Sequence, residues 1–575
     1  MKKYIYIISF IALLILPACD FMDEIPTEWH TPEAAFQLET TYERNINQGY
    51  AYIRNGYNRI NGAFLDAATN DATATMQNSN IHKLAQGFYN SQSPILNVWN
   101  SSYTGIRQTH FTEKYLKEVQ LFLNGKTEQD VANIKKEGIA QMWALRALYE
   151  FDLLQHYGGY VIIDSYMEIA DPRFNTLARS SFEACVNNIV TLCDSAAKYL
   201  SVKHASFGRM EKGMAMAIKA KTLLYAASAL YNRPANTNPL VGYVNASAVD
   251  VENRWKAAAA ALAEVINLKN GAANRYVLHA NYATLFNAAP NQNNEYIVFY
   301  ATAQSNGLER RQYPPTLSFT SGGGTVPSQQ FVDAFTNADG STYTRAPGAA
   351  PVYTGRDPRF NMIVGYDGSS YAPRGTIYTR LGDGETNDGL NKVKDFSTNT
   401  GYYMRKFLST TINFSVGSPG NTYHLFPFIR LADVLLMYAE AMTQAYGFES
   451  DPLGYGLTAK AAVEMVRKRA GFNNATDQYL VGATTKEQQL QKIYDERRIE
   501  LAFEEARYFD LRRWMKTDEL TEPIKGMRID NNGGTLTYTE ITVDNQRVFE
   551  EKMYFAPIPK NEILVFPALQ QNPGW

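Results

Sequence analysis

The stretch Glu496–Trp514, ERRIELAFEEARYFDLRRW, combines closely spaced charges with apolar residues at helical intervals. It predicts the last part of a helical region that runs from Lys486 to Trp514. Each acid lies near an arginine or on an exposed helix face, so we expect structural ion pairs and not catalytic acids. The charged residues expected to bridge helices are Arg497, Arg498, Glu500 and Glu504, and those expected to fill the core are Phe503, Phe509, Leu511 and Trp514.

Helical patterning also covers much of the chain before this stretch. Apolar side chains recur at intervals of three and four in residues 132–157, 210–231, 251–268 and 428–446. The first of these segments ends at Gly158-Gly159, a typical C-terminal stop. The helices follow one another in pairs of about the size of a tetratricopeptide unit, whose sequence pattern is only partly visible. We therefore predict degenerate helical-hairpin repeats, which usually present a concave face to a partner.

A segment of different composition separates these helical regions. From about Glu295 to His424, glycine, serine, threonine, asparagine and tyrosine dominate, with short β-like runs at 295–300 and 376–380. Insertions of this kind on a helical scaffold are where binding residues usually lie. The predicted fold class is mainly α, a tetratricopeptide-like helical-hairpin scaffold with a loop-rich insert carrying short strands.

The composition is that of a large folded protein. With 575 residues the chain is too long for one hydrophobic core, and two or three domain-sized units are expected. A formal net charge of −2 provides no basic footprint, so no nucleic-acid partner is expected. Aromatic residues reach 13%, with 38 tyrosines against 6 tryptophans. Tyrosine suits the binding of polar, ring-shaped ligands, but it suits a tyrosine-rich core equally well.

Common catalytic patterns are absent from the sequence. The 7 histidines include no i, i+4 pair of the metalloprotease kind, and no nucleophile elbow, Walker loop or dinucleotide fingerprint occurs. Asp530-Asn531-Asn532-Gly533 resembles the start of a calcium loop without its downstream glutamate, and it predicts a hairpin turn. We expect no metal and no cofactor. Paired carboxylates for glycoside hydrolysis stay open, because their separation is not readable from sequence.

The N-terminus has the pattern of a secretory signal. Lys2 and Lys3 precede an apolar run from Tyr4 to Leu16, shorter than the roughly 20 residues of a membrane-spanning helix. The run closes with Pro17-Ala18-Cys19, which resembles a bacterial lipobox. We predict a signal peptide over residues 1–18, acylation of Cys19 and a flexible tether over 19–30. The alternative is a plain signal peptide with a chance cysteine.

The two other cysteines, Cys185 and Cys193, fall in a helical pattern that runs from Arg179 to Leu200. Eight residues along a helix correspond to about 12 Å. A disulfide needs Cα atoms within about 7 Å of each other. We therefore predict two buried free thiols that pack as small hydrophobic side chains.

Four segments together resemble the SusD/RagB family of Bacteroidetes surface lipoproteins. Glu496–Glu504 followed by Arg507–Trp514 looks like the family signature, and Ile429–Leu436 with Tyr438–Ala441 resembles the preceding family helix. Pro557-Ile558-Pro559, Glu562-Ile563 and Gln571–Trp575 resemble the family C-terminus, and Cys19–Thr27 resembles its N-terminus. Two departures occur: Glu505-Ala506 where glycine-histidine is frequent, and Phe566-Pro567 where asparagine-proline is common.

The resemblance implies a non-catalytic receptor that captures nutrient, usually glycan, at the cell surface. It implies a lipid-anchored position on the outer membrane, above a SusC-like TonB-dependent transporter that performs the import. The expected units are the signal peptide and tether, an N-terminal helical region over 31–290, a loop-rich ligand-binding insert over 291–425, and a C-terminal helical region and tail over 426–575.

Ligand-binding candidates come from loop-like stretches, since no family motif transfers to them. The candidates are Tyr89, Asn90, Asn97, Trp99 and Tyr103 in the N-terminal region, and Arg310, Arg311, Tyr313 and Tyr353 in the insert. Trp99 also shares a three-four spacing with Tyr103 and Ile106, which favours a core position for its ring.

Two other functions stay open at this point. One is a peptide-capture subunit of a similar transporter, and the other is a surface glycoside hydrolase. Two carboxylates roughly 5–10 Å apart in a cleft would favour hydrolysis, whereas exposed tyrosines without them would favour capture.

Overall fold

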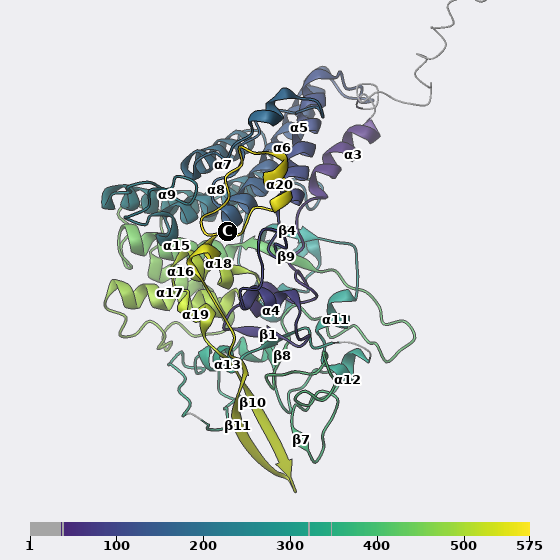
Figure 1. Ribbon diagram of the computed structural model, residues 1–575, viewed down its shortest axis with the longest axis vertical. Coiled ribbons are helices and arrows are strands. Elements are labelled where there is room, and N and C mark those ends of the chain that lie inside the picture. The colour runs from purple at the N-terminus through teal and green to yellow at the C-terminus, as the bar shows by residue number, and fades with distance from the viewer. Residues whose placement is uncertain (1–35, 37–38, 320–321, 347) are drawn as a thin grey trace, which may run out of the picture.

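The computed structural model describes residues 36, 39–319, 322–346 and 348–575. The predicted signal peptide, Cys19 and the tether lie outside the described residues. Helices dominate the described part of the chain (Figure 1). None of the described helices is both long and apolar enough to cross a membrane.

The N-terminal half is a stack of antiparallel helices in which each helix packs on the next. The stack confirms the predicted helical-hairpin scaffold, and α3 (Glu39–Tyr50) covers one end of it against α5 and α6. Its five long helices are α5 (Trp99–Glu118), α6 (Glu128–Tyr157), α7 (Phe182–Ala197), α8 (Lys212–Ala227) and α9 (Ala248–Ile266). The C-terminal helices continue it, because α15 (Leu431–Ala445) packs on α9 and then on α16 (Ala459–Ala470) and α17 (Lys486–Glu500).

The ends of α6 follow from local sequence chemistry. Thr127 and Asp130 form a capping box, in which each side chain accepts from the backbone N–H of the other residue. At the other end, Gly158 has a φ of 77° and donates its N–H to Leu154 O at 3.0 Å. A Cβ at Gly158 would lie 2.4 Å from Leu240 O, so a side chain would also block this close approach. The predicted stop at Gly158-Gly159 is confirmed.

Cys185 and Cys193 are both free and buried on α7, as predicted. Burial raises the pKa of the Cys185 thiol to about 12, so this thiol stays protonated and unreactive. Both cysteines therefore act as small side chains that pack in the core.

The helical region predicted from Lys486 to Trp514 is confirmed, but it consists of two helices. It breaks after Glu500, and a second helix, α18, runs from Ala506 to Arg513. Phe503 and Glu505 in the intervening turn both have a φ of 62°, in the left-handed region. Tertiary contacts hold this turn, since the Phe503 N–H donates to Asp66 Oδ1 at 2.8 Å and Glu505 pairs with Arg59 at 2.8 Å.

The two ends of the insert meet in a small sheet. β4 (Tyr296–Ala301) pairs antiparallel with β9 (Leu425–Arg430), which confirms the strand predicted at 295–300. The strand predicted at 376–380 is wrong: apart from an isolated bridge at Thr376 this segment is irregular, and β7 follows at Leu381–Gly382. Most of the insert consists of loops tied to the body, as where β5 (Thr325–Pro327) pairs with β1 (Ala72–Ala74).

A long hairpin follows the last long helices. β10 (Ile524–Asn532) and β11 (Thr535–Asp544) pair antiparallel around Gly533-Gly534, which confirms the predicted turn. The hairpin extends past the helices toward the end of the molecule that carries the insert (Figure 1). β10 also pairs in parallel with β7, so the sheet order is β11-β10-β7.

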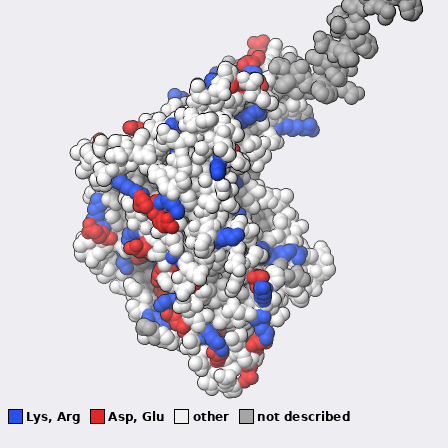
Figure 2. Space-filling model, viewed as in Figure 1, with Lys and Arg blue, Asp and Glu red and all other residues white. Residues whose placement is uncertain are grey.

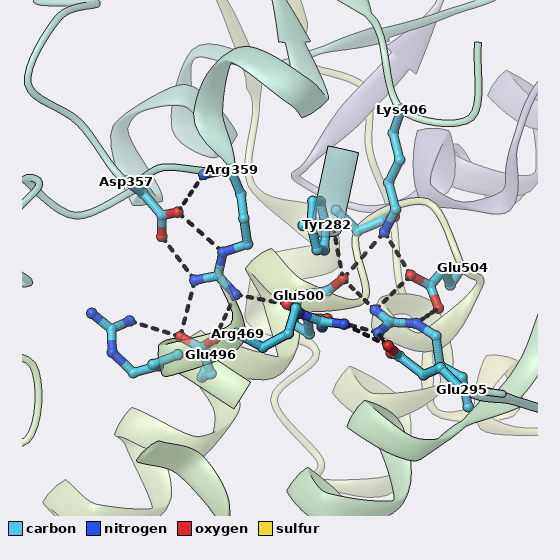
Figure 3. Close-up of polar contacts among 12 residues, drawn as sticks. Tyr282, Glu295, Asp357, Arg359, Lys406, Arg469, Glu496, Glu500 and Glu504 are labelled. Atoms are coloured by element: carbon cyan, nitrogen blue, oxygen red, sulfur yellow. Dashed lines mark hydrogen bonds and ion pairs between the residues drawn. The ribbon is translucent and has the colours of Figure 1, made fainter. Parts of the chain in front are cut away.

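A buried ionic network joins the insert to the C-terminal helices (Figure 3). Arg430, at the end of β9, donates to Glu295 at 2.7 Å, to Glu500 at 2.7 Å and to Glu504 at 2.8 Å. From the insert, Arg359 donates to Glu500 at 2.9 Å. These contacts bring segments more than a hundred residues apart into one cluster.

The charges in this network are almost fully removed from water. Arg359, Arg430 and Glu500 are 0% exposed. Burial alone would raise the pKa of Glu500, but guanidinium groups, Arg430 among them, hold it well below its usual range. Burial lowers the pKa of Lys406, which donates to Glu504 at 2.6 Å, to about 8. The expected bridging between helices is confirmed for Glu500 toward Arg469 of α16 and for Arg497 toward Asp433 of α15. Arg498 and Glu504 also form ion pairs, but their partners Asp71 and Lys406 lie in turns and not in helices.

Candidate functional site

A groove of about 410 Å³ runs along the outer face of α5. One wall is α5 itself, the second is the extended segment after α6, and the third is α20 (Lys560–Val565) with the tail that follows it. The lining residues on which the proposed function depends are Trp99, Asn100, Tyr103, Arg107, Tyr166, Phe174, Glu562 and Phe566.

Aromatic side chains at the start of α5 form one end of the groove. Trp99 is 3% exposed and lies against Tyr103, with ring centroids 4.9 Å apart, and edge-on to Tyr157 at 5.2 Å. Asn97 fixes this corner, because its Oδ1 accepts from the Trp99 N–H at 3.0 Å and from the Tyr157 hydroxyl at 3.2 Å. Asn97 therefore holds the first turn of α5 and the aromatic rings of Trp99 and Tyr157 at the same point.

Tyr103 holds the second wall against α5. Its hydroxyl accepts from the Val161 N–H at 2.8 Å and donates to Val161 O at 3.1 Å. Burial raises the pKa of Tyr103 well above its usual value, so this hydroxyl stays a neutral donor. The half-buried ring is thus fixed in position with part of its surface facing the groove.

Polar groups lie along the rim. The exposed Arg107 donates to the Tyr166 hydroxyl at 2.7 Å, with its guanidinium 5.0 Å from that ring. Asn100 is exposed on the same helix, and Glu562 faces it from α20. Amide, guanidinium and carboxylate groups beside aromatic surfaces suit the hydroxyls and CH faces of a sugar.

His110 also lines the groove, but it is not arranged for proton transfer. Burial and then the charge of Arg146 lower the pKa of His110 to about 3, so its imidazole is neutral near pH 7. Its Nε2 lies 2.9 Å from Ile163 O, where a neutral ring can donate. Glu562 is the one carboxylate among the lining residues of this groove. A pair of acids flanking a scissile bond is therefore not part of it.

The predicted N-terminal candidates separate into two places. Asn97 and Trp99 lie together at the start of α5, and Trp99 with Tyr103 lines the groove. Tyr89 is 8% exposed and packs against Trp575, with ring centroids 5.0 Å apart, outside the groove lining. Burial raises the pKa of Tyr89 well above its usual value.

The insert candidates lie apart from the groove lining and form two further groups. Tyr313 is 0% exposed and its hydroxyl donates to Ser409 O, so its ring has no free face for a ligand in this structure. Arg310 is exposed and stacks on Phe414 at 4.7 Å, and Phe414 also packs on Tyr313. Tyr353 is half-buried and stacks on Tyr366, with ring centroids 4.2 Å apart.

Arg107, Tyr166, Phe174 and Phe566 are groove residues that the sequence did not predict. Tyr166 and Phe174 lie in irregular segments, and Phe566 belongs to the tail, almost four hundred residues further along the chain. Among these four residues, only Arg107 could have been found from the local sequence, because it lies two turns after Trp99 on the same helix. The fold was needed to bring the others together.

Outside the groove, the described surface lacks an obvious single-sign patch on the face seen in Figure 2, where acidic and basic side chains are interspersed. Among the described residues, no group of three or more His, Cys, Asp or Glu side chains is placed to hold a metal ion. The arrangement offers a binding surface built from aromatic groups and from amide, guanidinium and carboxylate groups.

A stack of helical hairpins that carries a loop-rich insert and an aromatic groove defines a helical-repeat binding protein. The chain belongs to the SusD family, because the family model described by that name matches residues 285–575. A second model, described as "Starch-binding associating with outer membrane", matches residues 20–224. Members of this family are non-catalytic carbohydrate-binding proteins associated with the outer membrane.

Solved structures share this fold at low sequence identity. A SusD-like protein from Bacteroides fragilis is 23% identical, with a TM-score of 0.76, over 95% of this chain and 99% of that one. A SusD-like carbohydrate-binding protein from the same species is 19% identical, with a TM-score of 0.71, over 94% and 100%. A laminarin-binding SusD-like protein is 20% identical, with a TM-score of 0.60, over 94% and 100%. No curated protein sequence matches the chain significantly.

Proposed function

We propose that this protein captures a nutrient glycan in the α5 groove and passes it to a SusC-like TonB-dependent transporter. The groove carries the proposal, because it places the half-buried rings of Tyr103 and Phe174 beside the polar groups of Asn100 and Arg107, while the buried Trp99 supports Tyr103 from behind. Each stacked ring contributes on the order of 1 kcal/mol. A few such contacts give affinity around the millimolar level, which suits a receptor that must release its cargo.

The direct test compares groove variants with a matched control on the same helix. Arg107→Ala and Phe566→Ala should each weaken binding of a glycan several-fold in calorimetry, because each removes a contact of order 1 kcal/mol. Lys117→Ala, which removes an exposed cation of α5 that pairs with Glu113 outside the groove lining, should leave the affinity unchanged. Laminarin and starch oligosaccharides are the first probes, since the names of one solved structure and one family model mention these glycans.

Three outcomes would argue against this site or ligand. Equal affinity of the groove variants and the wild type would exclude the groove. If Tyr353→Ala lost affinity and the groove variants did not, the binding site would lie in the insert. Binding of short peptides in place of every glycan tested would favour the peptide-capture alternative.

The proposed location depends on Cys19, which would be acylated and would begin the mature chain once residues 1–18 are removed. One acyl chain binds a bilayer only marginally, so stable anchoring requires more than one. Cys19→Ala should leave ligand affinity and thermal unfolding unchanged and release the protein from outer-membrane fractions. Retention of the variant in cells that lack the transporter would contradict the lipid anchor.

A further inference from the structure

The hairpin β10–β11 leaves one strand edge without a neighbour in the described part of the chain. The sheet order β11-β10-β7 places β10 between two strands and β11 on the outside. In Figure 1, β11 lies on the side of the hairpin that faces away from β7. With 10 residues, β11 is the longest strand in the described residues, so the free edge is long as well.

The register shows which backbone groups point outward from this edge. Asn532 and Thr535 flank the two-residue turn, and in such a hairpin this pair exchanges hydrogen bonds while successive pairs alternate. The next pair is Asn531 and Leu536, and the Asn531 carbonyl indeed points away from β11, because it accepts from the Asp383 N–H at 3.0 Å. By the same alternation, Leu536, Tyr538 and Glu540 direct their N–H and C=O groups away from β10.

These outward groups have little of the usual protection of an edge strand. Natural edges are blocked by charged side chains, most often lysine, by proline or by a bulge, or are covered by another segment. Residues 535–544 contain neither lysine nor proline, and the bulge in the hairpin lies near its base, at Ile524-Lys525. Within the described ranges, no hydrogen bond reaches the outward backbone groups of Leu536, Tyr538 and Glu540.

The side chains of β11 also leave the edge accessible. Thr537 and Thr539 are exposed on one face of the ribbon. On the other face the Glu540 carboxylate is turned toward the body, where it pairs with Arg345 at 2.5 Å and Lys525 at 2.9 Å. Glu540 is the only charged residue between 535 and 543. An added strand would therefore meet little charge.

We propose that β11 pairs antiparallel with β11 of a second copy of this chain, with Tyr538 opposite the partner's Tyr538. In this register Leu536 faces the partner's Glu540, so all three outward residues of each strand find hydrogen-bond partners. Thr537 faces the partner's Thr539, a pair that stabilises antiparallel sheets. No like charges face each other, whereas a register centred on Glu540 would oppose two carboxylates. The two hairpins would form one continuous sheet.

A charge-swap experiment tests both the edge and the identity of its occupant. In sedimentation equilibrium from micromolar to millimolar concentration, the average mass of the purified full-length protein should rise toward twice that of the monomer. The double variants T537K/T539K and T537E/T539E should each remain monomeric, because like charges would then oppose across the pairing. An equimolar mixture of the two should associate again. Because both threonines are exposed, unfolding curves should show that the variants fold normally.

Hydrogen exchange locates the contact residue by residue. The N–H groups of Leu536, Tyr538 and Glu540 should exchange more slowly as protein concentration rises, while those of Thr537 and Thr539 already bond to β10. Tyr538→Pro removes one outward N–H without breaking a β10–β11 bond, so it should abolish association, and Tyr538→Ala should retain it.

The proposal is overturned by any of three results. The mass of the wild type could stay that of the monomer throughout the concentration range. The Lys and Glu variants could associate as the wild type does, which would place the contact elsewhere. Slowed exchange confined to residues outside β11 would show association through another surface.

Discussion

The helical stack and the insert keep their shapes by different means. In the stack, the alanine-rich helices α8 and α9 pack on each other, and alanines such as Ala220 and Ala259 are 0% exposed. The insert has an apolar cluster of its own, but its regular structure is sparse, and the side chains of Arg359 in the insert and Arg430 just after it are as deeply buried as those alanines. Apolar packing aligns the stack, whereas the insert adds buried charges to its apolar packing.

The difference follows from how the chain connects each region. Consecutive helices are already neighbours in sequence, and non-directional apolar packing is enough to align them. The insert consists of long irregular segments that could pack in many ways. Charge-assisted hydrogen bonds fix both distance and direction, so a few of them can select one arrangement.

The largest expected effect comes from removing the central cation of the network. Arg430→Met leaves Glu295, Glu500 and Glu504 buried without their shared donor. Loss of one partner of a buried ion pair costs about 3–5 kcal/mol. Arg469 still pairs with Glu295, Arg359 with Glu500 and Lys406 with Glu504, so we expect a loss of unfolding free energy of about this size, measured by urea denaturation, and faster proteolysis within the insert.

The control for Arg430 is an exposed arginine of the hairpin. Arg528 pairs with Asp530 at 2.8 Å on the surface, and Arg528→Met should change stability little. Similar losses in the two variants would show that the network does not hold the insert in place.

The second prediction concerns a carboxyl group buried in the stack without a full ion pair. Glu150 accepts from the Tyr160 hydroxyl at 2.8 Å and from the Asn188 amide at 2.6 Å, and burial raises its pKa to about 7. Because the carboxyl of the unfolded chain has the ordinary pKa of 4.5, stability is full below that pH and falls as pH rises to 7. The difference between the two pKa values corresponds to roughly 3 kcal/mol.

Glu150→Gln should remove this part of the pH dependence. Unfolding free energies of the variant and the wild type, measured at several pH values between about 4 and 8, should diverge in favour of the variant as pH rises. Parallel curves would mean that the pKa of Glu150 is the same in the folded and the unfolded chain.

The smallest effect is expected from overpacking the buried face of α9. Ala259→Leu adds three carbons at a side chain that is 0% exposed, and overpacking costs about 1–3 kcal/mol. Ala257→Leu is the matched control, because Ala257 is exposed on the same helix and leucine and alanine have similar helix propensities. Comparable melting temperatures for the two variants would show that the helices packed on α9 have room to separate from it.

Local pattern predicted the features that depend on neighbouring residues. The helical pairs, the stop at Gly158 and the turn at Gly533-Gly534 all follow from side-chain periodicity or backbone freedom within a few positions. The break at 501–505 could not be predicted in this way. It depends on Asp66, whose carboxylate accepts from the Phe503 N–H 437 residues further along the chain.

The residues of the candidate site also differ in whether the local sequence could predict them. Asn97 and Trp99 could be predicted, because a loop residue lies directly before the start of a helix there. Tyr166 and Phe566 reach the groove only through the fold. Tyr313 is the opposite case, since a tyrosine in a polar loop segment proves fully buried. Composition does not distinguish a ring that faces solvent from one that faces a core.

The ionic contacts around residue 500 also dictate an order of folding. Arg54 pairs with Glu505, 451 residues later in the chain. Asp66 likewise gains its hydrogen bond only when Phe503 is in place. Helices α5 to α9 can assemble early, because their contacts are local. The described segment before them and the insert must remain without their final partners until the C-terminal helices have formed. The segment that carries Arg54 and Asp66 is thus among the last to reach its native structure.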